Sequence, residues 1–136
     1  MSRTFAIDTN IAIYAFSDDP KNVTAQALLE MGPFISVQLL NEFANAILRK
    51  HLRPWAEIEE MLAIINNLVA DIRATDFDLH ALGREVAKRH EIGLYDSLII
   101  AAALLDDSDT LYSEDMQHGL IIDDRLTIIN PFLDTP

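Results

Sequence analysis

Four acidic residues spread along the chain have the side-chain type needed for hydrolytic chemistry at a phosphate: Asp8, Glu42, Asp96 and Asp115. Two carboxylates about 4 Å apart repel by roughly 4 kcal/mol at an effective dielectric constant of about 20. A cluster of four must therefore bind protons or share a hard divalent cation. Because its donors are oxygens, the cluster favours Mg²⁺ or Mn²⁺. Such a site is typical of metal-assisted phosphodiester hydrolysis.

The most apolar stretch of the chain positions two of these acids. Residues 97–105 are apolar almost all round, which predicts a helix covered on most sides. Asp96 lies at the start of this helix, where the partial positive charge of the helix dipole favours a carboxylate. A short strand over residues 109–112 then ends in a polar turn that contains Asp115.

The other two acids also follow short apolar strands. Residues 5–7 form the first predicted strand, and Asp8 comes directly after it. Residues 34–36 form the second strand, and Glu42 lies in the early turns of the next helix, over residues 37–51. Ligands bind at the carboxyl ends of the strands in parallel sheets. The topology can therefore bring all four acids to one edge.

The alternation of strands and helices predicts the fold class, an α/β domain built as a three-layer α/β/α sandwich with a short, mainly parallel central sheet. A chain of this length fits a single domain over residues 1–136. The other predicted helices cover residues 11–16, 20–31, 55–70 and 77–90, and the other predicted strands cover 72–75, 120–122 and 127–130.

Composition narrows the functional classes. The 136 residues include 22 acidic and 10 basic ones, and the net charge of −12 argues against broad binding to a polyanion. The negative net charge is still compatible with a nucleic-acid enzyme, because divalent cations can neutralise an acidic centre. The absence of cysteine excludes disulfides and thiolate zinc sites. No apolar run is long enough to span a bilayer and the first residues lack a signal-peptide layout, so we expect a cytoplasmic protein with no membrane partner.

The segments AIDTN, NEF, YDSLIIAAAL and YSEDMQHG have an order and spacing that resembles the PIN domain, and most of all the VapC-type toxins, the ribonuclease components of bacterial toxin–antitoxin pairs. The resemblance extends over essentially the whole chain. It implies a Mg²⁺ site, in which Mn²⁺ can substitute, with the catalytic and metal-binding residues Asp8, Glu42, Asp96 and Asp115. It implies that Asn10 and Ser113 are polar helpers. It also implies a homodimer, a cognate antitoxin protein that can place a basic side chain in the site, and a structured RNA substrate.

Several residues in these motifs have an alternative role. One alternative for Asp8 is a purely structural role as the cap of the helix after it. The alternative for Glu42 is an ordinary solvated glutamate. Glu114 competes with Asp115 for the site, although alternation along the strand end favours Asp115. His118 is either a solvated loop residue or a phosphate contact.

Two basic clusters are candidates for RNA-phosphate contacts. The first consists of Arg49, Lys50 and Arg53 beside His51, and the second of Arg84, Lys88 and Arg89 beside His90. Cations at helix C-termini are also favourable without any ligand, so either cluster can be purely structural. The predicted helical hairpin of residues 37–70, with Trp55 at its turn, is likewise either core or a partner surface.

Two rival functions fit parts of the sequence. A catalytically silent PIN-fold binding module would act through partner surfaces, but it would have no need to keep four repelling charges together. An aspartate-based phosphatase would form a phospho-enzyme on Asp8, but that chemistry usually needs a second acid two residues later, where the chain has Asn10. The sequence therefore favours a metal-dependent endoribonuclease. In the metal-free protein, we expect repulsion to raise the pKa of at least one of the four acids.

Overall fold

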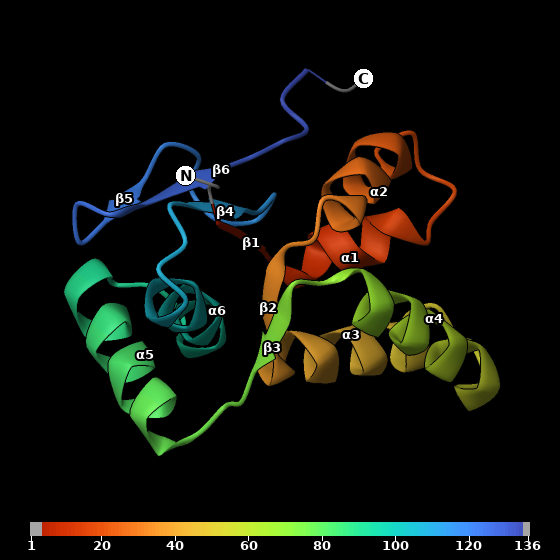
Figure 1. Ribbon diagram of the computed structural model, residues 1–136, viewed down its shortest axis with the longest axis horizontal. Coiled ribbons are helices and arrows are strands. Elements are labelled where there is room, and N and C mark those ends of the chain that lie inside the picture. The colour runs from red at the N-terminus through yellow and green to blue at the C-terminus, as the bar shows by residue number, and fades with distance from the viewer. Residues whose placement is uncertain (1–3, 135–136) are drawn as a thin grey trace.

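The computed structural model describes residues 4–134, so the ends of the predicted domain, residues 1–3 and 135–136, lie outside the described residues. Figure 1 shows the arrangement of the helices and strands. The helices are α1 (Thr9–Ala15), α2 (Asn22–Glu30), α3 (Val37–Arg49), α4 (Trp55–Leu68), α5 (Phe77–His90) and α6 (Leu94–Leu105). The strands are β1 (Phe5–Ile7), β2 (Phe34–Ser36), β3 (Asp71–Arg73), β4 (Thr110–Tyr112), β5 (Ile121–Ile122) and β6 (Leu126–Ile129).

The predicted elements are confirmed, with small shifts at their ends. The helix predicted from residue 20 begins at Asn22, because a turn occupies the residues before it. Asp19 closes this turn by accepting a hydrogen bond from the backbone of Lys21 on its side chain (2.9 Å) and from Asn22 on its carbonyl (2.8 Å). The first helix begins earlier than predicted, at Thr9, directly after its cap.

One six-stranded sheet, with the order β3-β2-β1-β4-β6-β5, forms the centre of the described part of the chain. Its neighbouring strands are parallel except for β5 and β6, which are antiparallel. Helices α5 and α6 lie on one side of the sheet and α1 to α4 on the other (Figure 1). This arrangement confirms the predicted three-layer sandwich with a mainly parallel sheet.

Helix α6 is buried, as its apolar sequence predicts. Every residue of it from Ser97 to Leu104 is buried. It packs closely against α5, because Gly83 faces it without a side chain. A Cβ atom added at Gly83 would lie 2.6 Å from Cδ2 of Leu98. The first turn of α6 carries Asp96.

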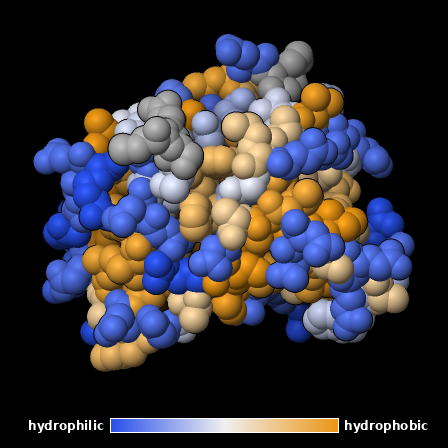
Figure 2. Space-filling view, viewed as in Figure 1, coloured by the Kyte–Doolittle hydropathy of each residue, from blue (hydrophilic) through white to orange (hydrophobic). Residues whose placement is uncertain are grey.

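The predicted hairpin consists of α3 and α4, and its inner face belongs to the core. Phe43, Ile47, Ile58 and Ile65 are buried, whereas Trp55 at the turn is 55% exposed. Figure 2 shows that hydrophobic side chains on the viewed face form patches separated by hydrophilic ones. Among residues 4–134, no helix combines the length and the apolar character that crossing a membrane requires.

Candidate active site

All four predicted acids line one cleft at the carboxyl edge of the sheet. They come from different parts of the fold. Asp8 is the N-cap of α1, Glu42 lies on α3, Asp96 lies in the first turn of α6, and Asp115 follows β4. The cleft has a volume of about 280 Å³, and its other lining residues are Thr9, Asn10, Ile13, Asn45, Ala46 and Lys50.

Asp8 is the most deeply buried of the four acids, with 4% of its surface exposed. Ile7 lies opposite Tyr112 in the parallel register of β1 and β4, so Ser113 leaves its strand beside Asp8. The Asp8 carboxylate accepts hydrogen bonds from Ser113 Oγ (2.8 Å) and from the backbone N–H of Thr9 (2.7 Å). Burial raises the pKa of Asp8 from 3.8 to about 6, these hydrogen bonds only partly oppose the rise, and neighbouring negative charges add to it.

Glu42 and Asp96 face the cleft from two other helices. Thr9 Oγ1 donates a 2.7 Å hydrogen bond to Glu42 Oε2, so Glu42 is held beside Asp8 and is not an ordinary solvated glutamate. Burial raises the pKa of Asp96, and the negative charge of Asp115 raises it further. The raised pKa expected from the sequence is thus found, but its main cause is burial, and repulsion between the acids only adds to it.

Asn10 links two of the acids. Its Nδ2 donates hydrogen bonds to Asp8 Oδ2 (3.2 Å) and to Asp115 Oδ2 (3.1 Å). Its Oδ1 accepts a hydrogen bond from the backbone N–H of Glu114 (3.2 Å). This geometry suits a polar helper that orients carboxylates, a role that stays a prediction for Asn10.

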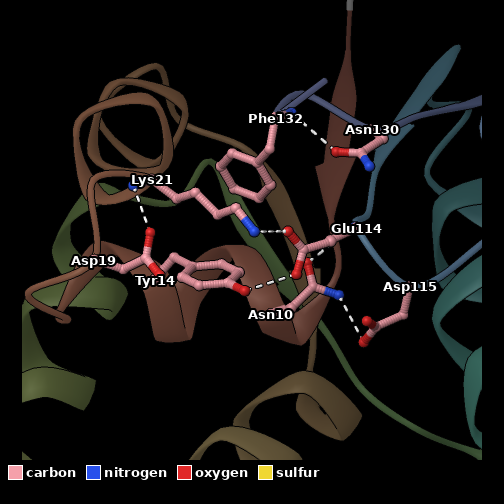
Figure 3. Close-up of polar contacts among 8 residues, drawn as sticks. All are labelled: Asn10, Tyr14, Asp19, Lys21, Glu114, Asp115, Asn130 and Phe132. Carbon is pink, nitrogen blue, oxygen red and sulfur yellow. Dashed lines mark hydrogen bonds and ion pairs between the residues drawn. The ribbon is translucent and has the colours of Figure 1, made fainter. Parts of the chain in front are cut away.

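Glu114 is turned toward a different set of partners. Its Oε1 accepts a hydrogen bond from the Tyr14 hydroxyl (2.7 Å), and its Oε2 pairs with Lys21 Nζ (2.5 Å). Burial tends to raise the pKa of Glu114, but the hydrogen bonds from Lys21 and Tyr14 outweigh it and lower that pKa below its usual value. Asp115 lies on the other side of Asn10 (Figure 3) and lines the cleft, as strand alternation predicts.

The four acids share the cleft without forming a ready ligand cage. Between residues 4 and 134, no group of three or more His, Asp or Glu side chains is arranged to hold a metal ion. Asp8, Glu42 and Asp115 each accept hydrogen bonds from neighbouring residues, and Asp96 is partly exposed. The catalytic and ligand assignments of all four acids therefore stay predictions.

The structure distinguishes the two basic clusters. Lys50 lines the acidic cleft. His51 and Arg53 line a neighbouring hollow of about 150 Å³, and Ile13 lines both. Arg49 is exposed at the end of α3. The first basic cluster therefore extends from the acidic cleft into the hollow beside it.

The second cluster does not line the cleft. Arg89 forms a 2.9 Å ion pair with Asp123, which lies in the turn between β5 and β6. Lys88 lies 3.8 Å from Glu85 on the same helix, and Arg84 is exposed. Two of its three cations therefore have acidic neighbours of their own.

Sequence reasoning missed Thr9, Tyr14 and Lys21. Thr9 lies between two motif residues, so its position was a usable signal. Lys21 carried no signal, because its partner Glu114 is 93 residues away in the sequence. His118, left open by the sequence, accepts a hydrogen bond on Nδ1 from the backbone of residue 130 (2.9 Å) and lies outside the lining of the cleft.

Comparison with known proteins connects this geometry to a family. The family model of the PIN domain matches residues 5–119. A search of curated proteins finds no significant match.

Solved structures with a similar fold include VapBC2 from Rickettsia felis, bound to a DNA fragment from its promoter, with a TM-score of 0.67, 19% identity, and 93% of this chain and 99% of that chain covered. A toxin–antitoxin complex from Klebsiella pneumoniae has a TM-score of 0.68 and 19% identity, with coverages of 94% and 97%. VapC20 from Mycobacterium tuberculosis, a toxin that cleaves the sarcin–ricin loop, has a TM-score of 0.68 and 17% identity, with coverages of 82% and 92%. At these identities, the likeness concerns the fold.

Proposed function

Because this chain belongs to the PIN-domain family, we propose that it is a metal-dependent endoribonuclease that hydrolyses RNA phosphodiester bonds in its acidic cleft. The observation that carries the proposal is the convergence of four carboxylates from different elements of the fold on one cleft. We assign the catalytic and metal-binding roles to Asp8, Glu42, Asp96 and Asp115.

The donors of the cleft fit Mg²⁺, with Mn²⁺ as a substitute. The acidic donors are all oxygens, and no histidine of the described residues lines the cleft. In the described part of the chain, none of the four acids forms a salt bridge, so no direct ion pair neutralises them. When bound, such a cation would polarise the phosphate and lower the pKa of the attacking water.

Neighbouring side chains hold the acids in place. The backbone N–H of Thr9 binds Asp8, and the hydroxyl of Thr9 binds Glu42. The Nδ2 group of Asn10 bonds both Asp8 and Asp115. Because these groups are oriented before the substrate arrives, less reorganisation is needed during the reaction.

We assign the RNA-phosphate contacts to the first basic cluster, Arg49, Lys50 and Arg53. Lys50 lines the acidic cleft itself, and Arg53 lines the hollow beside it, where it lies 3.7 Å from Glu57. A flexible ammonium group next to the acids can bind a phosphate close to the bond that is cleaved. Support for the second cluster is weaker, because Arg89 is already paired with an acid.

The salt dependence of RNA binding tests this assignment. Each lost contact to a single-stranded phosphate reduces the slope of log affinity against log salt by about 0.7. We expect Lys50→Ala to reduce the slope by about this amount, and the matched variant Arg89→Ala to leave it unchanged. A reduced slope for Arg89→Ala alone would move the contacts to the second cluster.

We further propose that the chain is the toxin of a toxin–antitoxin pair and acts in the cytoplasm as a homodimer. Neighbours of similar fold that were solved as toxin–antitoxin complexes support the antitoxin partner. An antitoxin with a basic segment would also suit the net charge of −12 and the acidic cleft. Expression in a bacterium should arrest growth unless the product of an adjacent reading frame is co-expressed, and light scattering should give the mass of two chains.

The central experiment is RNA cleavage by the purified protein. We expect cleavage with Mn²⁺, none with EDTA, and a loss of at least about a hundredfold for Asp96→Asn. Arg73→Met is a suitable control, because it removes a 2.7 Å ion pair with Asp106 at the opposite end of α6. The alternative, a catalytically silent binding module, predicts no cleavage and no rise in melting temperature with Mn²⁺.

A further inference from the structure

A group of polar and aromatic side chains around Lys21 lies beside the acidic cleft and has no part in the function proposed above. Lys21 Nζ pairs with Glu114 and lies 5.0 Å from the ring centroid of Tyr14 and 5.6 Å from that of Phe132. The rings of Tyr14 and Phe132 meet edge to face at a centroid distance of 5.2 Å. We call these four residues the Lys21 cluster (Figure 3).

The Lys21 cluster is tied to separate segments of the chain. Tyr14 belongs to α1, and Lys21 directly precedes α2. Asp19 accepts a hydrogen bond from the backbone N–H of Lys21 (2.9 Å), and Phe132, after β6, donates one from its backbone to Asn130 (2.9 Å). The side chains of Lys21 and its acidic partner are 25% and 23% exposed, so solvent screens their ion pair only in part.

The backbone of Glu114 connects the cluster to the cleft. Its N–H donates a hydrogen bond to Asn10 Oδ1 (3.2 Å). An asparagine amide has one accepting end and one donating end, so this bond directs Nδ2 toward the carboxylates of Asp8 and Asp115. If the amide turned over, its oxygen would face two carboxylates and repel both.

We propose that Lys21 and Tyr14 are positioning residues of the metal site: by holding Glu114, they fix the amide of Asn10, which in turn orients the two acids. This inference rests on the proposed function, and it gives Glu114 a role outside the ligand set. Hydrogen bonds behind metal ligands commonly change metal affinity by about 10–100-fold.

The first test measures metal affinity without catalysis. Lys21→Met keeps most of the side-chain length and its contact with the rings, but removes the charge. We expect the Mn²⁺ dissociation constant to rise about tenfold. It is measured from the electron paramagnetic resonance signal of free Mn²⁺, well below the unfolding temperature. Lys21→Arg can still pair with Glu114 and should recover most of the affinity. The control Arg73→Met should lower the melting temperature and leave the dissociation constant unchanged.

The second test needs no metal. In the metal-free protein, the side-chain amide resonances of Asn10 should shift in Lys21→Met and stay in place in Arg73→Met. Unchanged Asn10 resonances, or an unchanged dissociation constant in a protein whose wild type binds Mn²⁺, would overturn the inference. If the wild type binds no Mn²⁺ at all, the proposed function fails, and the amide resonances still decide whether Lys21 positions Asn10.

Discussion

Replacing Asp8 with asparagine should stabilise the metal-free protein at neutral pH, although the same change should abolish metal binding. Asp8 is 4% exposed, and burial raises its pKa from 3.8 to about 6. Between these two values the folded chain keeps a proton that the unfolded chain has lost, so the free energy of unfolding falls as the pH rises through this window. The difference corresponds to a loss of about 3 kcal/mol, which an uncharged asparagine avoids.

Part of this gain is offset by the amide group that the variant introduces. Asp8 Oδ2 accepts hydrogen bonds from Ser113 Oγ (2.8 Å) and from Asn10 Nδ2 (3.2 Å). The Ser113 hydroxyl can turn and become an acceptor, but the Asn10 amide loses one of its two acceptors and keeps only Asp115, at a cost of about 1 kcal/mol. The net gain of about 2 kcal/mol should raise the melting temperature by roughly 6 °C in a domain of this size.

Thermal unfolding in EDTA, followed by circular dichroism, measures this effect. The gain should be present at about pH 7.5 and absent at about pH 3, where Asp8 is protonated in both states. With saturating Mn²⁺ the order should reverse, because only the wild type is stabilised by binding. A variant that melts below the wild type in EDTA at neutral pH would refute the view that the buried charge is costly.

Three further substitutions probe separate parts of the molecule. Ser113→Ala removes a hydrogen bond to Asp8 and should weaken Mn²⁺ binding about tenfold in calorimetry. Glu42→Gln keeps an acceptor for the Thr9 hydroxyl but loses the charge, so RNA cleavage should fall by at least about tenfold in kinetic assays while circular dichroism stays the same. Ile65→Ala empties a fully buried position and should lower the free energy of unfolding by about 2–5 kcal/mol in urea titration.

The parts of the fold that the sequence predicts are those that depend on local patterns. An apolar run beginning at Ser97 is enough to place α6 inside the molecule, and the short apolar runs at residues 5–7 and 34–36 are enough to place β1 and β2. Asp8 and Asp96 could be placed at helix starts for the same reason, because caps and first turns have recognisable residue types.

Contacts between distant segments could not be predicted in this way. The pairing of Lys21 with Glu114 depends on the parallel neighbours β1 and β4, whose order no local periodicity specifies. The same holds for the ion pair of Arg89 with Asp123, which separates one basic cluster from the other. That Asp115 lines the cleft and Glu114 does not was predictable only because successive side chains at a strand end alternate in direction.

The burial that makes a charged Asp8 unfavourable in the metal-free protein also favours a cation beside it. Hydrogen bonds from Ser113 and Thr9 favour the charged form of Asp8, yet burial still raises its pKa to about 6. A divalent cation beside the carboxylate would reverse this balance, since an opposite charge lowers the pKa of an acid. If Asp8 is a ligand, as we propose, metal binding below about pH 6 would displace a proton from it, and metal affinity would be coupled to pH. The buried carboxylate of Asp8, which is costly in the metal-free protein, is thus also a group through which a bound cation would stabilise the fold.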